Sequence, residues 1–121
     1  MNENIQAFRQ RFGADPAVCA AAPGRLEVLG NHTDYNEGFV LSAAVDRVTV
    51  VSMSPVEGNI CTIHERGTDV TLDLNDLETY VKGDWLNYLK GLLLELRKRG
   101  KTFGAFNAEL SSTVPLSAGM S

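Results

Sequence analysis

Residues 22–41 read APGRLEVLGNHTDYNEGFVL and are the most informative stretch of the chain. The mainly apolar residues 26–29, which include Glu27, predict a short strand between a turn at residues 23–24 and Gly30. Loops beside such a strand commonly carry binding residues, and here they hold Arg25, His32, Asp34 and Tyr35. His32 and Asp34 can accept hydrogen bonds from sugar hydroxyls, and Arg25 can hold a phosphoryl charge. The stretch indicates a site for a polyol and an anion. The alternative is a turn in which Asp34 and Asn36 cap backbone groups.

The rest of the chain predicts an α+β fold with a mostly antiparallel sheet and packed helices. Helices are expected at residues 5–12 and 85–99, and strands at residues 18–22, 26–29, 45–53, 59–65, 70–74 and 106–112. The short turns between the middle strands favour a meander. Asp84 is the expected N-cap of the second helix and Gly100 its stop. The apolar stripe of that helix comprises Trp85, Leu89, Leu92, Leu93 and Leu96.

Composition limits the class of protein. The chain has 121 residues, 44% of them hydrophobic, which predicts one globular domain over residues 1–121. A net charge of −4 argues against a nucleic-acid or anionic-membrane partner. The chain shows no signal-peptide pattern and no apolar run of about 18 residues. Two cysteines are too few for a disulfide framework, so we expect a reduced, cytoplasmic setting.

Three segments together resemble a known family. The segment at 22–41 resembles the galactokinase signature of the superfamily named for galacto-, homoserine, mevalonate and phosphomevalonate (GHMP) kinases. The runs WLNYLKG at 85–91 and VPLSAGMS at 114–121 agree with the same family in order and spacing. The resemblance covers nearly the whole chain. It implies the N-terminal domain fold of these kinases and ATP-dependent phosphorylation of galactose at its C1 hydroxyl, with Mg²⁺.

The resemblance also implies a role for individual residues. Arg25 is similar to the family's catalytic arginine. The expected sugar-binding residues are Asn31, His32, Asp34 and Tyr35. On the nucleotide side, Trp85 and Tyr88 are expected to line the adenine pocket, although Trp85 fits a core role equally well. The phosphate loop is expected to begin at 114–121, with Pro115, Ser117, Gly119 and Ser121, and the metal ligands are expected beyond residue 121.

One departure concerns the sugar. Galactokinases carry Glu directly before the His and usually Asn four residues earlier, whereas this chain has Asn31 and Glu27. A carboxylate only accepts hydrogen bonds, whereas an amide both donates and accepts, so the contact to the sugar's primary hydroxyl changes. Kinases for N-acetylgalactosamine, arabinose, fucose or a heptose are therefore alternatives. A non-catalytic sugar-sensing regulator is another.

The resemblance further implies that the chain holds only the leading part of such a kinase domain. We therefore expect catalysis from the full-length protein and none from these 121 residues alone. Uncovered apolar surface would favour self-association of the isolated chain. A metal site of His32, Asp34 and His64 is a further alternative, which the presence of only two histidines, with no i, i+4 pair, disfavours. We expect His64 to be a half-exposed surface residue.

Overall fold

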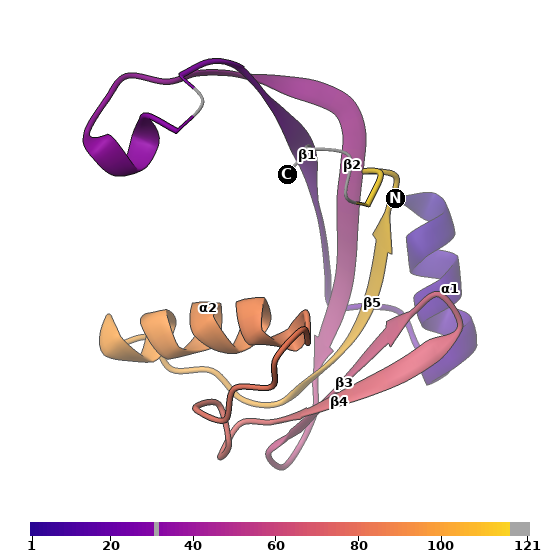
Figure 1. Ribbon diagram of the computed structural model, residues 1–121. Helices are drawn as coiled ribbons and strands as arrows, with labels where there is room; N and C mark the ends of the chain where they lie inside the picture. Colours follow the sequence, from indigo (N-terminus) through magenta and orange to yellow (C-terminus); the bar gives the residue numbers. More distant parts are fainter. Residues whose placement is uncertain (31, 117–121) are drawn as a thin grey trace.

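The computed structural model describes residues 1–30 and 32–116 and contains one five-stranded sheet with a helix on each face (Figure 1). In chain order its elements are α1 (Asn2–Phe12), β1 (Val18–Leu29), the short 3₁₀ helix η1 (Asp34–Asn36), β2 (Leu41–Pro55), β3 (Ile60–Glu65), β4 (Thr68–Asp73), α2 (Leu86–Lys98) and β5 (Phe106–Ser112). The α+β class is confirmed. No helix in the described part of the chain is long and apolar enough to cross a membrane.

The order of the strands is β1-β2-β5-β3-β4, so the predicted meander is wrong. Strand β5 lies between β2 and β3, antiparallel to the first and parallel to the second. The other two pairs, β1 with β2 and β3 with β4, are antiparallel hairpins. The meander prediction assumed that β2 and β3 pair because a short turn joins them, but the last strand of the chain separates them.

Strand β1 is one long strand and not two short ones as predicted. Its pairing with β2 shifts register between Pro23 and Arg25, which marks an irregularity and not a turn. Pro23 is tolerated because β1 is an edge strand. Gly24 is buried, and a Cβ there would lie 3.1 Å from the methyl groups of both Val45 and Val114. The glycine therefore serves close packing within a continuous strand.

Helix α2 covers the apolar face of the sheet. It begins and ends within one residue of the prediction, and Gly100 follows it with φ of 72°. Trp85 is the N-cap residue, while the Asp84 carboxylate accepts a hydrogen bond of 2.9 Å from the Leu86 amide. Leu86 and Leu93 are buried in the core, but Leu92 is 57% exposed, so its predicted place on the buried stripe is wrong. The core shared with the sheet comprises Cys61, Ile63, Leu72, Leu74, Leu77, Leu86, Leu93, Ala105, Phe106 and Ala108.

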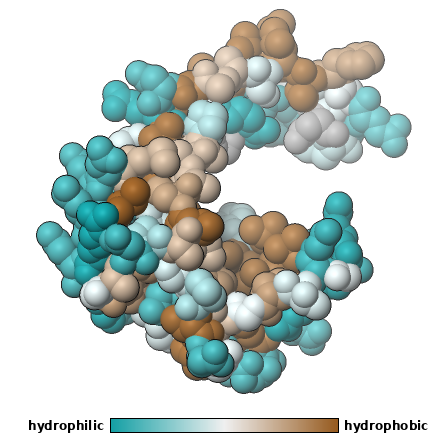
Figure 2. All heavy atoms as spheres, turned by 180° about the vertical axis from the view of Figure 1, so that it is seen from behind, coloured by the Kyte–Doolittle hydropathy of each residue, from teal (hydrophilic) through white to brown (hydrophobic). Residues whose placement is uncertain are grey.

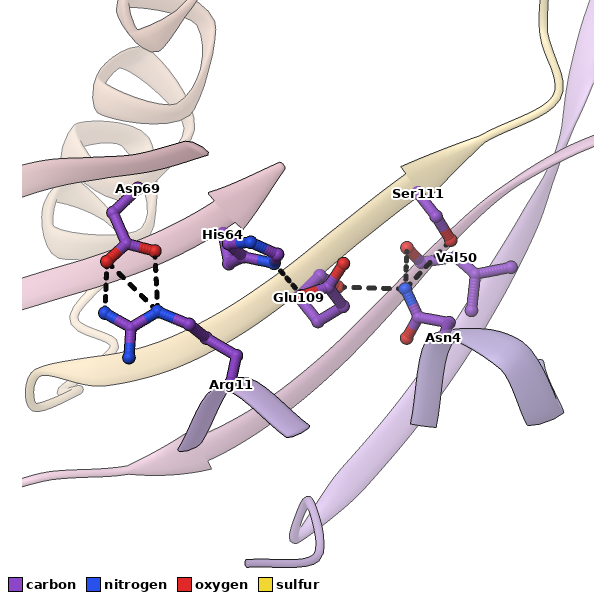
Figure 3. A network of polar contacts seen from close by, with 7 residues as sticks. All are labelled: Asn4, Arg11, Val50, His64, Asp69, Glu109 and Ser111. Carbon is purple, nitrogen blue, oxygen red and sulfur yellow. Dashed lines mark hydrogen bonds and ion pairs between the residues drawn. The ribbon is translucent and has the colours of Figure 1, made fainter. Parts of the chain in front are cut away.

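Helix α1 covers the opposite face, where polar residues form a row across four strands. The register places Ser52 opposite Glu109, Glu109 opposite His64, and His64 opposite Asp69. We call these four residues the polar row. His64 Nδ1 lies 2.5 Å from Glu109 Oε2, and the His64 side chain is only 18% exposed (Figure 3). The expectation of a half-exposed surface histidine is therefore wrong, because most of the side chain is covered and its Nδ1 contacts Glu109.

Two side chains of α1 bind this face of the sheet (Figure 3). Asn4 is 3% exposed, and its Nδ2 donates to the carbonyl oxygens of Val50 (3.3 Å) and Glu109 (3.2 Å) and to Ser111 Oγ (2.8 Å). At the other end, Arg11 Nε donates to both carboxylate oxygens of Asp69, at 2.9 and 3.1 Å. This ion pair lowers the pKa of Asp69. The helix is thus held to the sheet by polar contacts near both of its own ends.

The molecule is hollowed on the α2 side. The β1–β2 hairpin extends well beyond the other strands, and its far end lies across an open space from α2 (Figure 1). The space-filling view shows this hollow, with apolar side chains over much of its floor (Figure 2). Trp85, Leu92 and several hairpin residues are among the exposed large apolar side chains, and Phe39 is fully exposed.

Replacing Asn4 tests the attachment of α1. Asn4→Ala removes three hydrogen bonds at a buried position and should lower the free energy of unfolding by about 2 kcal/mol in urea denaturation. Gln6→Ala, at an exposed position of the same helix, is the matched control and should change it by less than about 0.5 kcal/mol. Equal effects of the two substitutions would contradict the structural role of Asn4.

Candidate functional site

The loop that joins β1 to β2 is organised around Thr33. Its Oγ1 donates to the carbonyl oxygen of Gly30 at 2.6 Å and contacts that of Phe39 at 3.1 Å. Its own carbonyl accepts hydrogen bonds from the amides of Asn36 (3.0 Å) and Gly38 (2.8 Å). Thr33 therefore joins the two sides of the loop. Sequence reasoning missed this role; the available signal was a hydroxyl residue between two glycines in a short polar loop.

Two glycines allow the loop to close. Gly30 has φ of 98°, and a Cβ there would lie 2.6 Å from the carbonyl oxygen of Phe39. A Cβ on Gly38 would lie 2.7 Å from the Cβ of Thr33. Real Cβ atoms do not approach other atoms so closely, so side chains at either position would force the loop apart.

The predicted sugar-binding residues lie in this loop. His32 has φ of 62°, and its ring meets the ring of Tyr35 edge-on with centroids 5.9 Å apart. Both side chains are exposed. Asn36 Nδ2 donates to the His32 carbonyl at 3.0 Å. The side chain of Asn36 therefore caps a backbone group, as the alternative interpretation of this stretch expected. Asp34 begins η1 in the same loop. Asn31, also predicted to bind sugar, lies outside the described residues.

Arg25 lies on β1, and the expected phosphate loop follows β5, which is separated from β1 by β2. Arg25 is an exposed residue of β1, paired with Ala44 of β2. Beyond β5, Thr113 donates its amide to the Val48 carbonyl at 2.9 Å, and Val114 packs against Gly24, the residue before Arg25. Pro115 follows and is exposed. Ser117, Gly119 and Ser121, the other predicted loop residues, lie outside the described part of the chain.

Trp85 and Tyr88 line a cavity of about 480 Å³ at the beginning of α2. Its wall comprises Tyr80, Gly83, Asp84, Trp85, Asn87 and Tyr88. Tyr88 is 85% exposed and Trp85 36%. Trp85 also lines an apolar cavity of about 190 Å³ between α2 and the sheet, so it fits both of its predicted alternatives. Sequence reasoning missed Tyr80, whose signal was an aromatic residue in an otherwise turn-rich run before the helix.

A metal site of His32, Asp34 and His64 finds no support. Among residues 1–30 and 32–116, no group of three or more His, Cys, Asp or Glu residues is arranged to hold a metal ion. His64 instead pairs with Glu109 in the polar row.

Comparison with known proteins agrees with this geometry. A family model described as the galactokinase galactose-binding signature matches residues 6–55. Galactokinase from Roseiflexus sp. is 35% identical over 123 aligned residues, covering 96% of this chain and 30% of that protein. The structure of Lactococcus lactis galactokinase complexed with galactose matches 99% of the chain and 32% of its own, with a TM-score of 0.85 and 25% identity. Methanococcus jannaschii mevalonate kinase matches 85% of the chain and 34% of its own, with a TM-score of 0.64 and 17% identity, a likeness of fold.

The sheet and its two helices have the fold of the N-terminal domain of GHMP kinases. Among known proteins the chain is similar to galactokinases, through the signature match at residues 6–55 and through curated relatives that align with 96% of it. The chain spans about 30% of the length of the curated relatives that it matches.

Gly30→Ala tests whether close packing determines the conformation of the β1–β2 loop. The added Cβ would meet the Phe39 carbonyl, and hydrogen exchange of the Asn36 and Gly38 amides should accelerate by about tenfold or more. Gly67→Ala is the matched control, because Gly67 also has positive φ (79°) but a Cβ there meets nothing within 4 Å. Comparable acceleration of these amides in the control would show that the loop does not depend on this contact.

Proposed function

We propose that this chain supplies the sugar site and the nucleotide-facing wall of an ATP-dependent galactokinase, which phosphorylates galactose at its C1 hydroxyl. The observation that carries the proposal is the placement of Arg25. The signature loop follows at the end of the same strand, and Val114, at the start of the expected phosphate loop, packs against the preceding Gly24. Arg25 therefore follows directly on the point where β1 meets the phosphate-side segment, and the same strand leads from it into the sugar-side loop.

Each part of the site has a distinct task in this reaction. Asn31, His32, Asp34 and Tyr35 bind the sugar hydroxyls. Arg25 stabilises the charge of the transferring phosphoryl group, since phosphoryl transfer depends mainly on positioning and electrostatic stabilisation. Backbone amides of the segment with Pro115, Ser117, Gly119 and Ser121 cradle the phosphates. Trp85 and Tyr88 contact the adenine.

ATP is the proposed phosphoryl donor and Mg²⁺ its counter-ion. Among the described residues, no group of three or more His, Cys, Asp or Glu could hold Mg²⁺. The ligands of Mg²⁺ would therefore be the phosphates of ATP and residues outside this part of the chain. A cytoplasmic compartment belongs to the same proposal and is supported by two free thiols, Cys19 and Cys61. Burial raises the pKa of the Cys61 thiol, which keeps it protonated at neutral pH.

A kinase for another monosaccharide is the second candidate. The observation that favours it is Asn31, where the family signature carries Glu. N-acetylgalactosamine, arabinose, fucose and a heptose are the sugars to test. A non-catalytic sugar-sensing regulator would keep the same binding residues without the chemistry.

The deciding experiment is a phosphorylation assay of the full-length protein that carries this segment, with ATP, Mg²⁺ and a panel of monosaccharides. Galactose 1-phosphate as the main product supports the proposal. Binding of galactose without turnover would favour the regulator. The 121-residue chain, assayed in parallel, should show no turnover and should self-associate through its exposed apolar residues.

Arg25→Ala tests the phosphoryl-stabilising role. In the full-length kinase it should lower kcat by about 10²- to 10³-fold, the loss typical of removing one charge-stabilising donor. The melting temperature should change little, because Arg25 is exposed. Arg99→Ala, at an exposed arginine at the end of α2, is the control and should retain turnover. An unchanged kcat in Arg25→Ala would rule out the assignment.

Asn31→Glu tests the sugar preference. If Asn31 shifts the preference away from galactose, restoring the family's carboxylate should raise kcat/KM for galactose relative to the other sugars, because a carboxylate accepts a hydrogen bond from the primary hydroxyl more strongly than an amide. The measurement is kcat/KM across the sugar panel. Unaltered ratios would show that position 31 does not determine specificity.

A further inference from the structure

Asn87 makes a matched pair of hydrogen bonds to one backbone residue across the cavity wall. Its Nδ2 donates to the Val81 carbonyl at 2.6 Å, and its Oδ1 accepts from the Val81 amide at 3.2 Å. Asn87 lies in the first turn of α2, between Trp85 and Tyr88, and its side chain is half-buried. Val81 directly follows Tyr80 in the segment before the helix.

Further hydrogen bonds hold the same segment. Lys90 Nζ donates to the Thr79 carbonyl at 2.8 Å, so the residues on both sides of Tyr80 are tied to α2. The Asp84 amide donates to the Val81 carbonyl at 3.1 Å, which closes the turn that contains Gly83. Because Tyr80 itself is 71% exposed, these backbone contacts, and not burial of its ring, determine its position.

From these contacts we propose that Asn87 is a positioning residue for the nucleotide wall: it sets the place of Tyr80 relative to Trp85 and Tyr88, and so the width of the 480 Å³ cavity. The nucleotide as occupant rests on the proposed function. The positioning itself rests only on the hydrogen bonds. Asn87 acts through Val81 and is assigned no contact with the ligand.

Only a side chain with one donor and one acceptor at this length completes the pair. Asp is nearly isosteric, but it would place a carboxylate oxygen against the Val81 carbonyl, where the amide now donates at 2.6 Å. Asn87→Asp therefore turns an attraction into a repulsion without changing the packing volume. Asn87→Ala removes both hydrogen bonds without adding charge.

Trp85 reports on this wall because it is the single tryptophan of the chain. In the 121-residue chain without nucleotide, Asn87→Asp should raise the acrylamide quenching constant of Trp85 fluorescence by about twofold, as loss of the pair lets the Tyr80 segment move away. Asn59→Asp, at an exposed turn position that does not line the cavity, is the matched control and should leave the constant unchanged.

Kinetics of the full-length kinase provide the second measurement. Asn87→Asp should raise KM for ATP by about tenfold while kcat and KM for galactose stay within about twofold, the pattern of lost nucleotide binding. A merely structural role would lower the melting temperature without this selectivity for ATP. Unchanged quenching together with an unchanged KM for ATP would overturn the proposal.

The two measurements separate this inference from the proposed function. If the full-length protein phosphorylates no sugar, the proposed function fails, and Trp85 quenching alone decides whether Asn87 positions the wall. If Asn87→Asp does not fold, Asn87→Ala takes its place in both measurements. Raised quenching in that variant supports the proposal, and quenching equal to that of the parent chain overturns it.

Discussion

The insertion of β5 between β2 and β3 is the constraint on which the rest of the structure depends. Without it the chain would consist of two separate hairpins, β1 with β2 and β3 with β4, and isolated two-stranded hairpins are at best marginally stable. Strand β5 joins them through seven paired positions with β2 and four with β3. The same strand provides Glu109 to the polar row and Ala108 to the apolar core, so it anchors both layers.

Strand alternation explains why the two helices pack so differently. On β5, residues 108 and 110 face the α2 side and residues 109 and 111 the α1 side, and their partners on β2 alternate in the same way. Helix α2 therefore packs against leucine and phenylalanine side chains of the sheet, whereas α1 packs against glutamate and serine. Asn4 satisfies backbone oxygens that belong to two adjacent strands, and it thereby joins the helix to the β2–β5 seam.

Local pattern predicted the elements well because it depends on neighbours in sequence. The bounds of β5 agree exactly with the prediction, and α2 agrees within one residue, because period and end signals coincide there. Pairing could not be predicted in this way, since β5 meets β3 across more than forty residues. The predicted turn at Pro23-Gly24 was wrong for a related reason. A strand can continue through these two residues because β1 is an edge strand and because Val114 packs against Gly24, and neither fact can be read from the local sequence.

Two groups of the predicted site residues, the β1–β2 loop and the aromatic wall, are each held by their own polar residue. Thr33 closes the sugar-side loop, and Asn87 holds the aromatic wall. The sequence offers a signal for the hydroxyl of Thr33 between two glycines, but the partners of both side chains depend on which carbonyl lies opposite in the folded chain. The loop lies at the end of the extended hairpin and the wall at the beginning of α2, joined through the sheet (Figure 1). The hydrogen bonds of the Thr33 side chain stay within the loop, and those of the Asn87 side chain stay within the segment before α2 and its first turn. Each of the two polar residues therefore stabilises the segment in which it lies.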